Sequence, residues 1–147
     1  MYPALAVFQA LYARQPDVEI LWVGGESGME AELVKRAGLP FASIPAGGLH
    51  GVGLRVLPRS LARLARGLFA SRKILNDFRP DVLFFTGGYV AGPMAVAGRH
   101  VPTLLYVPDI EPGLALKSLA RLADRIAVSA EDSARYFHRK VIVTGQL

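Results

Sequence analysis

Two kinds of hydrophobic pattern alternate along the chain. Short runs such as Val82–Thr86 and Thr103–Val107 are apolar at almost every position, whereas longer segments place apolar residues three and four positions apart. The longer spacing is that of an amphipathic helix. Strands without polar alternation are typical of a parallel sheet that is covered on both faces. The pattern therefore predicts strands and helices in regular alternation.

The boundaries of these elements follow from their glycines and prolines. Strands are predicted at 18–23, 41–44, 82–86, 103–107, 125–129 and 141–144. Helices are predicted at 3–14, 30–37, 58–78, 93–99, 114–123 and 130–137, with a glycine-rich loop at 47–53. This order predicts an α/β fold with a doubly wound, Rossmann-like parallel sheet, in one domain over residues 1–147. Such a domain normally begins with its central strand, and because this chain begins with a helix we expect that strand to be lacking.

The run from Val82 to Met94 is the first candidate for binding chemistry. A strand ends at Gly87-Gly88, Tyr89 follows, and Gly92-Pro93 opens the next segment. A glycine turn before a helix presents backbone N–H groups to an anion and lets a bulky ligand approach the main chain. The alternative is a tight strand-to-helix turn with no ligand. We predict that Gly87, Gly88, Tyr89 and Gly92 bind a phosphate, a diphosphate or a sugar attached to one.

Composition narrows the class of partner. The chain has a net charge of +5, is 52% hydrophobic, and has no cysteine and three scattered histidines. Thiolate metal sites are excluded, a zinc cluster is not expected, and we expect neither a metal nor a cofactor. The basic balance suggests an anionic partner. The most apolar stretch, 82–98, is interrupted by glycines and a proline, so it is interpreted as a buried strand and turn rather than a transmembrane helix.

Much of the positive charge falls in one long predicted helix. No Asp or Glu occurs between Glu32 and Asp77. Helical spacing places basic side chains on one face and leucines on the opposite face, which we expect to pack on the sheet. The basic residues are Arg55, Arg59, Arg63, Arg66 and Lys73, and the leucines are Leu57, Leu61, Leu64, Leu68 and Leu75. We predict that the basic face lies against an anionic membrane. A solvated helix face is the alternative, and nucleic acid is not expected because no binding motif accompanies the charge.

Four further residues are weaker candidates. Asp109 and Glu111 follow a predicted strand at the sheet edge where α/β proteins bind ligands, and they could orient a hydroxyl or act as a base. Glu30 could contact a ligand or cap its own helix. His50 lies in the glycine loop and could touch ligand. A second glycine run, 24–28, follows the second strand rather than the first, so a dinucleotide site there is only weakly indicated.

Several motifs recur together in one glycosyltransferase family. They are Tyr2–Val7, Leu21–Gly24, Gly28–Ala31, Gly47-Gly48-Leu49 with Gly51 and Gly53, Arg79–Val82, Gly87–Pro93, Pro112-Gly113 and Leu119–Arg125. Over essentially its whole length the chain resembles the N-terminal half of MurG-like glycosyltransferases of family 28. These two-domain GT-B enzymes add N-acetylglucosamine to the lipid-linked muramoyl-pentapeptide of peptidoglycan.

The resemblance implies roles for the chain. The N-terminal domain of the family binds the lipid-linked pyrophosphoryl acceptor on the inner face of the cell membrane, and a C-terminal domain binds the UDP-sugar donor. We expect this chain to be the acceptor domain alone, inactive without a donor-binding domain or subunit. The alternatives are a natural half-enzyme completed by a separate donor-domain protein, a hexosyltransferase with another lipid acceptor, or a different α/β enzyme acting on nucleotide sugars. Exposed sheet edges would also favour a homo-oligomer.

Three departures from the family pattern limit the assignment of a catalytic base. In the family, a first strand and a Gly-Gly-x-Gly-Gly-His loop, which holds the favoured base, come before the segment that matches Tyr2. We expect this chain to lack both. The family's His-Glu-Gln-Asn run falls on Tyr106–Asp109, where none of the four residues matches, and Gly-Asn-Pro is replaced by Gly145-Gln146-Leu147. Asp109 and Glu111 therefore remain the candidates for a catalytic role within the chain.

Overall fold

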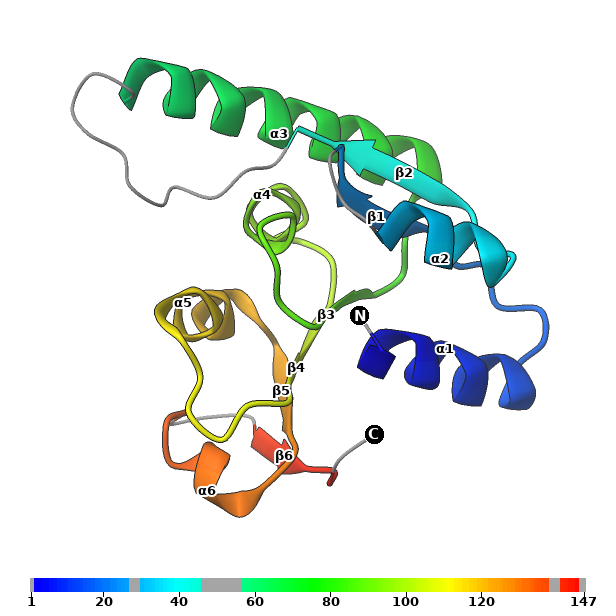
Figure 1. The fold of residues 1–147 in the computed structure, drawn as a ribbon, viewed down its shortest axis with the longest axis vertical. Helices are drawn as coiled ribbons and strands as arrows, with labels where there is room; N and C mark the ends of the chain where they lie inside the picture. Colours follow the sequence, from blue (N-terminus) through cyan, green and yellow to red (C-terminus); the bar gives the residue numbers. More distant parts are fainter. Residues whose placement is uncertain (1, 27–29, 46–56, 138–140, 146–147) are drawn as a thin grey trace. The chain divides into compact units, whose positions relative to one another are not determined.

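The computed structural model describes residues 2–26, 30–45, 57–137 and 141–145 (Figure 1). Helices and strands alternate along the chain, as the hydrophobic pattern predicts. In chain order they are α1 (Tyr2–Arg14), β1 (Trp22–Gly25), α2 (Glu30–Arg36), β2 (Phe41–Ile44), α3 (Leu57–Phe78), β3 (Leu83–Phe85), α4 (Ala91–Ala97), β4 (Thr103–Val107), α5 (Leu114–Leu122), β5 (Arg125–Val128), α6 (Glu131–Ala134) and β6 (Val141–Val143).

All the strand pairs of the described residues are parallel, which confirms the predicted fold class. They form two sheets, one with the order β1-β2 and one with the order β3-β4-β5-β6. In a doubly wound sheet the strand before the first helix lies between the two halves. No strand precedes α1 among the described residues, and none pairs with the second side of β1 or of β3.

The chain divides into two compact units, which we describe separately. The first comprises Met1–Glu19, Asp81–Gly87 and Arg99–Leu147 and contains the four-stranded sheet. α5 covers one face of this sheet and α1 lies on the opposite side (Figure 1). Leu105, Val107 and Val128 are completely buried and Leu119 of α5 is nearly so, which places the core between β4, β5 and α5. Residues that are apolar along the whole strand are what this two-sided burial requires.

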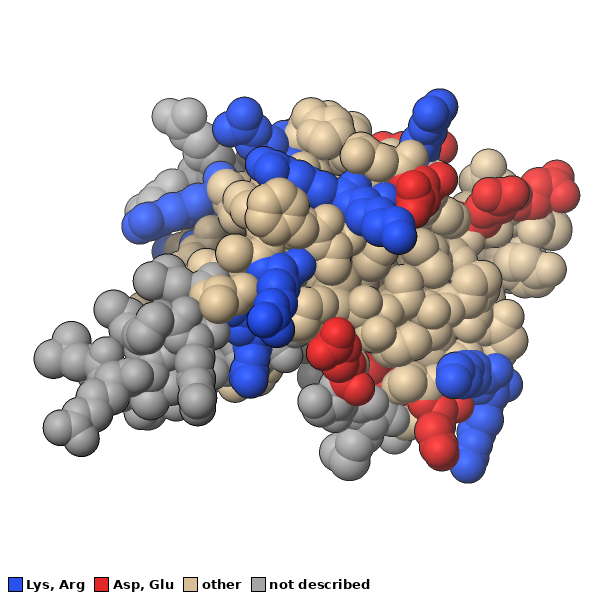
Figure 2. Space-filling view, turned by 90° about the horizontal axis from the view of Figure 1, so that it is seen from above, with Lys and Arg blue, Asp and Glu red and all other residues tan. Residues whose placement is uncertain are grey.

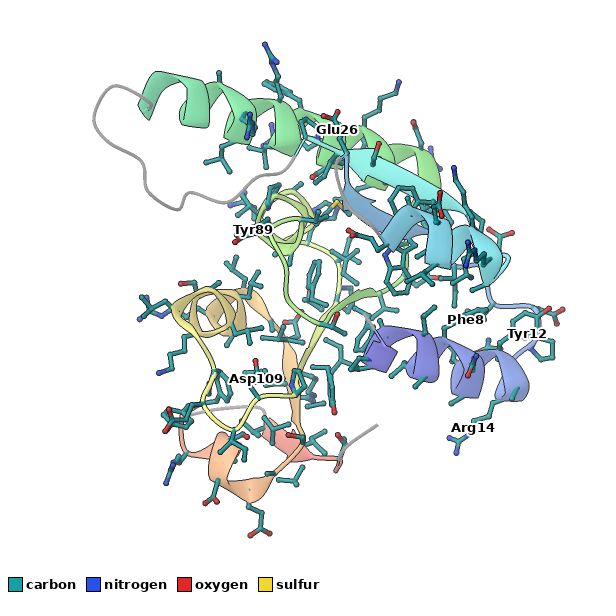
Figure 3. The ribbon with its side chains drawn as sticks, viewed as in Figure 1. Phe8, Tyr12, Arg14, Glu26, Tyr89 and Asp109 are labelled. Carbon is teal, nitrogen blue, oxygen red and sulfur yellow. The ribbon has the colours of Figure 1, made fainter. Side chains whose placement is uncertain are left out.

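Main-chain and side-chain hydrogen bonds fix the start of β4. The Thr103 amide donates to the Asp124 carboxylate at 2.9 Å, and the Asp124 amide donates to the Thr103 carbonyl at 3.0 Å. On the other side of the first unit, the Phe8 and Tyr12 rings of α1 pair with centroids 5.7 Å apart (Figure 3).

The second unit comprises Ile20–Pro80 and Gly88–Gly98. α2 packs on β1 and β2, and α3 packs on β2 and on α4. Its core contains Val34, Ile44, Leu75 and Met94. α3 and α4 approach closely at Gly67, where a side-chain carbon would lie 2.9 Å from the Pro45 carbonyl oxygen and 3.5 Å from Cγ of Pro93.

Three predicted elements differ from the structure by two residues or more at one or both ends. β1 begins at Trp22 rather than residue 18, because Val18 closes a turn on Gln15 and the parallel partner of β1 begins only at Phe41. α4 begins at Ala91 rather than residue 93 and ends at Ala97. α6 ends at Ala134 rather than residue 137, because the chain then continues in tighter turns with bonds between residues three apart.

Candidate functional site

The turn after β3 adopts a backbone that favours glycine. Gly87 has φ of 102° and Gly88 has φ of 91°, a region that L side chains rarely adopt. A side-chain carbon on Gly87 would also lie 3.3 Å from Cδ2 of Leu116 on α5, whereas one on Gly88 would meet nothing within 4 Å. The fold therefore gives two reasons for glycine at position 87, its backbone conformation and the contact with Leu116. At position 88 it gives only the first of these.

Gly92 is different from the two glycines of the turn. It lies inside α4, its φ is not positive, and a side-chain carbon there would have no atom within 4 Å. Glycine in a helix costs up to about 1 kcal/mol relative to alanine. Neither backbone conformation nor packing among the described residues requires this glycine. Tyr89, just before α4, is 59% exposed (Figure 3). Open main chain beside an exposed aromatic ring is a suitable surface for a bulky ligand.

The loop after β4 holds both acidic candidates. Asp109 and Glu111 are exposed, and Asp109 stands at the carboxyl end of β4 (Figure 3). The main chain of this loop is held by two serines, because Ser129 Oγ donates to the Pro108 carbonyl at 2.8 Å and Ser133 Oγ donates to the Asp109 carbonyl at 3.0 Å. Ser133 is completely buried. The position of Asp109 is thus set by β5 and α6 as well as by its own strand.

A group that the sequence analysis missed lies next to this loop. The Nζ atom of Lys117 on α5 lies 4.6 Å from the ring centroid of Tyr136, and the guanidinium carbon of Arg135 lies 5.2 Å from the same centroid. Arg135 also donates to the Tyr136 hydroxyl at 3.5 Å, which raises the pKa of the guanidinium. These three residues are called the Tyr136 cluster below. A sequence pattern could not reveal it, because Lys117 lies in α5 and Tyr136 in the turns that follow α6.

In the second unit, Glu30 begins α2, as expected for an acid that stabilises a helix N-terminus. A side-chain carbon on Gly24 would lie 2.6 Å from the Phe41 ring and 3.0 Å from the Glu30 carboxylate. Close packing against Phe41 therefore accounts for Gly24, and the glycine run at 24–28 needs no nucleotide to explain its first residue. Residues 27–29 of that run lie outside the described residues.

The basic face of α3 is exposed where its side chains are described. Arg63, Arg66 and Lys73 all lie at the surface. Figure 2, seen from the side of α3, shows Lys and Arg side chains spread along this face with uncharged residues between them. Of the predicted residues, Arg59 lies in α3 with only its backbone described, and Arg55 and His50 lie outside the described residues.

The apolar side chains of α3 correct one expectation. Leu75 is buried as predicted, but Leu64 is 49% exposed, so it does not pack on the sheet as expected. Phe69, which the leucine pattern omits, is 69% exposed. Val96 on the neighbouring α4 is 50% exposed. The signal for Phe69 in the sequence is its spacing, because Arg66, Arg72 and Lys73 lie three or four residues away on the same helix face.

Within the described ranges, no group of three or more His, Asp or Glu side chains could hold a metal ion. Among the helices that the structure describes, none has both the length and the apolar character needed to cross a membrane.

Comparison with known proteins identifies the family. The model of the glycosyltransferase family 28 N-terminal domain matches residues 1–128. The chain belongs to this family. It is 43% identical over 152 residues to the UDP-N-acetylglucosamine–N-acetylmuramyl-(pentapeptide) pyrophosphoryl-undecaprenol N-acetylglucosamine transferase of Desulforudis audaxviator, and 38% identical over 148 residues to the transferase of the same name from Listeria welshimeri.

These relatives are longer than the chain. The two alignments cover 99% of this chain but only 40% and 41% of the relatives. The crystal structure of Acinetobacter baumannii MurG superposes with a TM-score of 0.78 at 22% identity, over 99% of this chain and 41% of that one. This likeness confirms the GT-B type, Rossmann-like fold. The MurG-like resemblance inferred from the motifs is therefore confirmed for family and fold.

Proposed function

We propose that this chain is the acceptor- and membrane-binding part of a MurG-like N-acetylglucosaminyltransferase. Its ligand would be a lipid-linked pyrophosphoryl sugar, and its place the inner face of the cell membrane. The observation that carries the proposal is the packed pair of α3 and α4. One helix of the pair has a basic and apolar outer face, and the other contains Gly92 of the candidate glycine segment.

The outer face of this pair has the chemistry of a membrane-binding surface. Arg63, Arg66 and Lys73 would attract anionic headgroups by about 1 kcal/mol each near the surface. Phe69 stands exposed among them, and burying such a side chain at the headgroup boundary adds the apolar part of the binding energy.

The glycine segment supports binding of the acceptor's polar head. The backbone at Gly87 and Gly88 is held in a glycine-specific conformation, and Gly92 leaves open main chain on α4. Because α4 packs on α3, a ligand at Gly92 would lie on the same helix pair as the membrane-binding face. This arrangement suits a molecule whose sugar and diphosphate are polar and whose tail remains in the bilayer.

In the complete reaction a hydroxyl oxygen of the acceptor attacks the anomeric carbon of UDP-N-acetylglucosamine. The bond from that carbon to the UDP oxygen breaks, UDP leaves with its electron pair, and a base takes the hydroxyl proton. Asp109 and Glu111 are the candidate bases within the chain. A donor-binding domain or subunit must hold UDP-N-acetylglucosamine, and closure of two domains would bring the reactants together. We expect the 147-residue chain alone to bind acceptor without turnover.

Vesicle co-sedimentation tests the membrane part. The chain should bind vesicles containing phosphatidylglycerol and bind pure phosphatidylcholine vesicles weakly. Arg63→Glu/Arg66→Glu should abolish binding, and Phe69→Ser should weaken it about tenfold, since burial of a phenylalanine is worth about 1.5–3 kcal/mol. The matched control is Arg14→Glu/Arg125→Glu, which makes the same change in net charge at exposed positions of the first unit.

Comparison of the Arg63/Arg66 variant with the Arg14/Arg125 control separates binding by the α3 face from a general effect of net charge. Equal loss in the Arg63/Arg66 variant and in the control would show that only net charge matters and would contradict the proposed face. Acceptor binding is measured separately, by titrating the chain in detergent with a short-chain prenyl-pyrophosphoryl sugar. Saturable binding is expected, and its absence at millimolar concentration would contradict the acceptor role.

A further inference from the structure

The Tyr136 cluster places two cationic side chains on one aromatic ring. Lys117 reaches the ring from α5, and Arg135 folds onto it from the neighbouring position in the chain, at 4.6 Å and 5.2 Å from the centroid. A cation over an aromatic face is attracted by the ring, by about 0.5–1 kcal/mol at an exposed site. Both cations are therefore held against the same ring.

Neither cation is neutralised by a nearby acid. Among the described residues the ion pair within 4.0 Å joins Arg36 and Glu32, in the other unit. Asp132 and Glu111 act on Arg135 only from a longer distance. Neither cation is therefore held in a direct ion pair among the described residues, which leaves each of them open to contact with an anion.

The cluster lies on the side of the first unit where α/β proteins bind ligands. α5 and α6 follow the carboxyl ends of β4 and β5, and ligands of open parallel sheets bind outside those ends. Leu116, the residue before Lys117, is the side chain that lies against Gly87. The Lys117 amide donates to the Gly113 carbonyl at 3.1 Å, so its position is tied to the loop that follows Asp109.

We propose that Lys117, Arg135 and Tyr136 form a binding subsite for a phosphoryl group. The Lys117 ammonium supplies a point charge, and the Arg135 guanidinium supplies planar donors that match phosphate oxygens. Because the Tyr136 hydroxyl already accepts from Arg135, its own proton can be donated to the same anion. Two cations and one hydroxyl match the charge and the acceptors of a phosphate better than those of a carboxylate, which brings a single charge.

This subsite contains none of the residues proposed above for acceptor or membrane binding. It can therefore be tested even if the chain binds no lipid-linked sugar. The phosphoryl group could belong to a soluble diphosphate or to a lipid headgroup, and the experiment distinguishes the two sources.

The test is a titration of the 147-residue chain with inorganic pyrophosphate, followed by ¹H–¹⁵N NMR. Saturable shifts are expected at the amides of Lys117, Arg135 and Tyr136. Lys117→Gln and Arg135→Gln should each weaken binding by about fivefold or more, as expected for loss of a charge-assisted hydrogen bond. Tyr136→Phe keeps the ring and should weaken binding by less, about two- to fivefold. The dispersion of the remaining amide signals reports whether each variant is folded.

The matched control is Arg121→Gln, which removes one exposed positive charge from the same helix, one turn beyond Lys117. It should change the dissociation constant by less than about twofold. An equal loss of affinity in this control would overturn the proposal. It would also be overturned if the pyrophosphate shifts do not saturate and the variants bind phosphatidylglycerol vesicles as well as the unsubstituted chain does. Cluster-dependent binding to phosphatidylglycerol vesicles would assign the site to a lipid headgroup, and cluster-dependent binding of pyrophosphate without such vesicle binding would assign it to a soluble ligand.

Discussion

Replacing Gly92 by alanine separates ligand binding from folding in the glycine segment. The added methyl group would meet no atom within 4 Å, and the backbone there does not have a positive φ. Alanine is favoured over glycine in helices by up to about 1 kcal/mol, and the gain is smaller in a first turn. The free energy of unfolding should therefore stay the same or rise by a few tenths of a kcal/mol.

Gly88→Ala is the matched comparison for this variant. A methyl group would also find open space there, but the residue has φ of 91°, so alanine must adopt a conformation that costs about 1–2 kcal/mol. Gly88→Ala should lower the stability of the fold by that amount. The two variants thus add the same methyl group in the same segment with opposite effects on stability.

Acceptor binding should respond differently from stability. If a ligand lies on the open main chain of α4, the methyl group of Gly92→Ala occupies space that the ligand needs. We expect binding of a short-chain prenyl-pyrophosphoryl sugar to weaken about tenfold, equivalent to about 1.4 kcal/mol. Urea denaturation measures the stability of each variant, and isothermal titration in detergent measures its affinity. Unchanged affinity in a Gly92→Ala protein of normal stability would refute the idea that this glycine is there for a ligand.

Three further results follow from the packing. Ser133→Ala should destabilise the fold by about 1 kcal/mol in urea denaturation, because it removes a part-buried hydrogen bond made by a completely buried side chain. Ser118→Ala, which removes an exposed bond of similar length, should cost less than about 0.5 kcal/mol. Leu105→Ala should cost about 2–5 kcal/mol by the same measurement, since Leu105 is completely buried in β4. Because the second side of β3 has no partner strand among the described residues, dimers are expected in multi-angle light scattering, and a sharp monomer peak at high micromolar concentration would count against them.

The fold could be predicted from sequence where local pattern decides it. Thr103–Val107 and Phe41–Ile44 were predicted with their observed boundaries, because each is an apolar run between turn residues. β1 was placed too early because its start depends on where β2 begins, which is a property of the partner strand. α6 was predicted too long because residues 135–137 have helical pattern but form tighter turns.

The candidate sites follow the same division. The basic face of α3 could be read from spacing along one helix, and Arg63 and Arg66 are exposed as predicted. The leucine pattern marks only the opposite face of α3, so it gives no prediction for Phe69. The Tyr136 cluster was missed because it joins residues from two segments that only the folded chain brings together.

The glycines show how structure sharpens a sequence motif. In the sequence, Gly24, Gly87, Gly92 and Gly113 all stand at turns or helix starts of an α/β pattern. The structure gives three of them a reason: Phe41 fills the space beside Gly24, positive φ fixes Gly87, and Gly113 precedes α5 at the N-cap position, where glycine is readily accepted. Gly92 alone among these four has neither a steric nor a conformational reason in the described structure. A ligand that needs open main chain would explain it, and this makes Gly92 the sharpest probe of the proposed acceptor site.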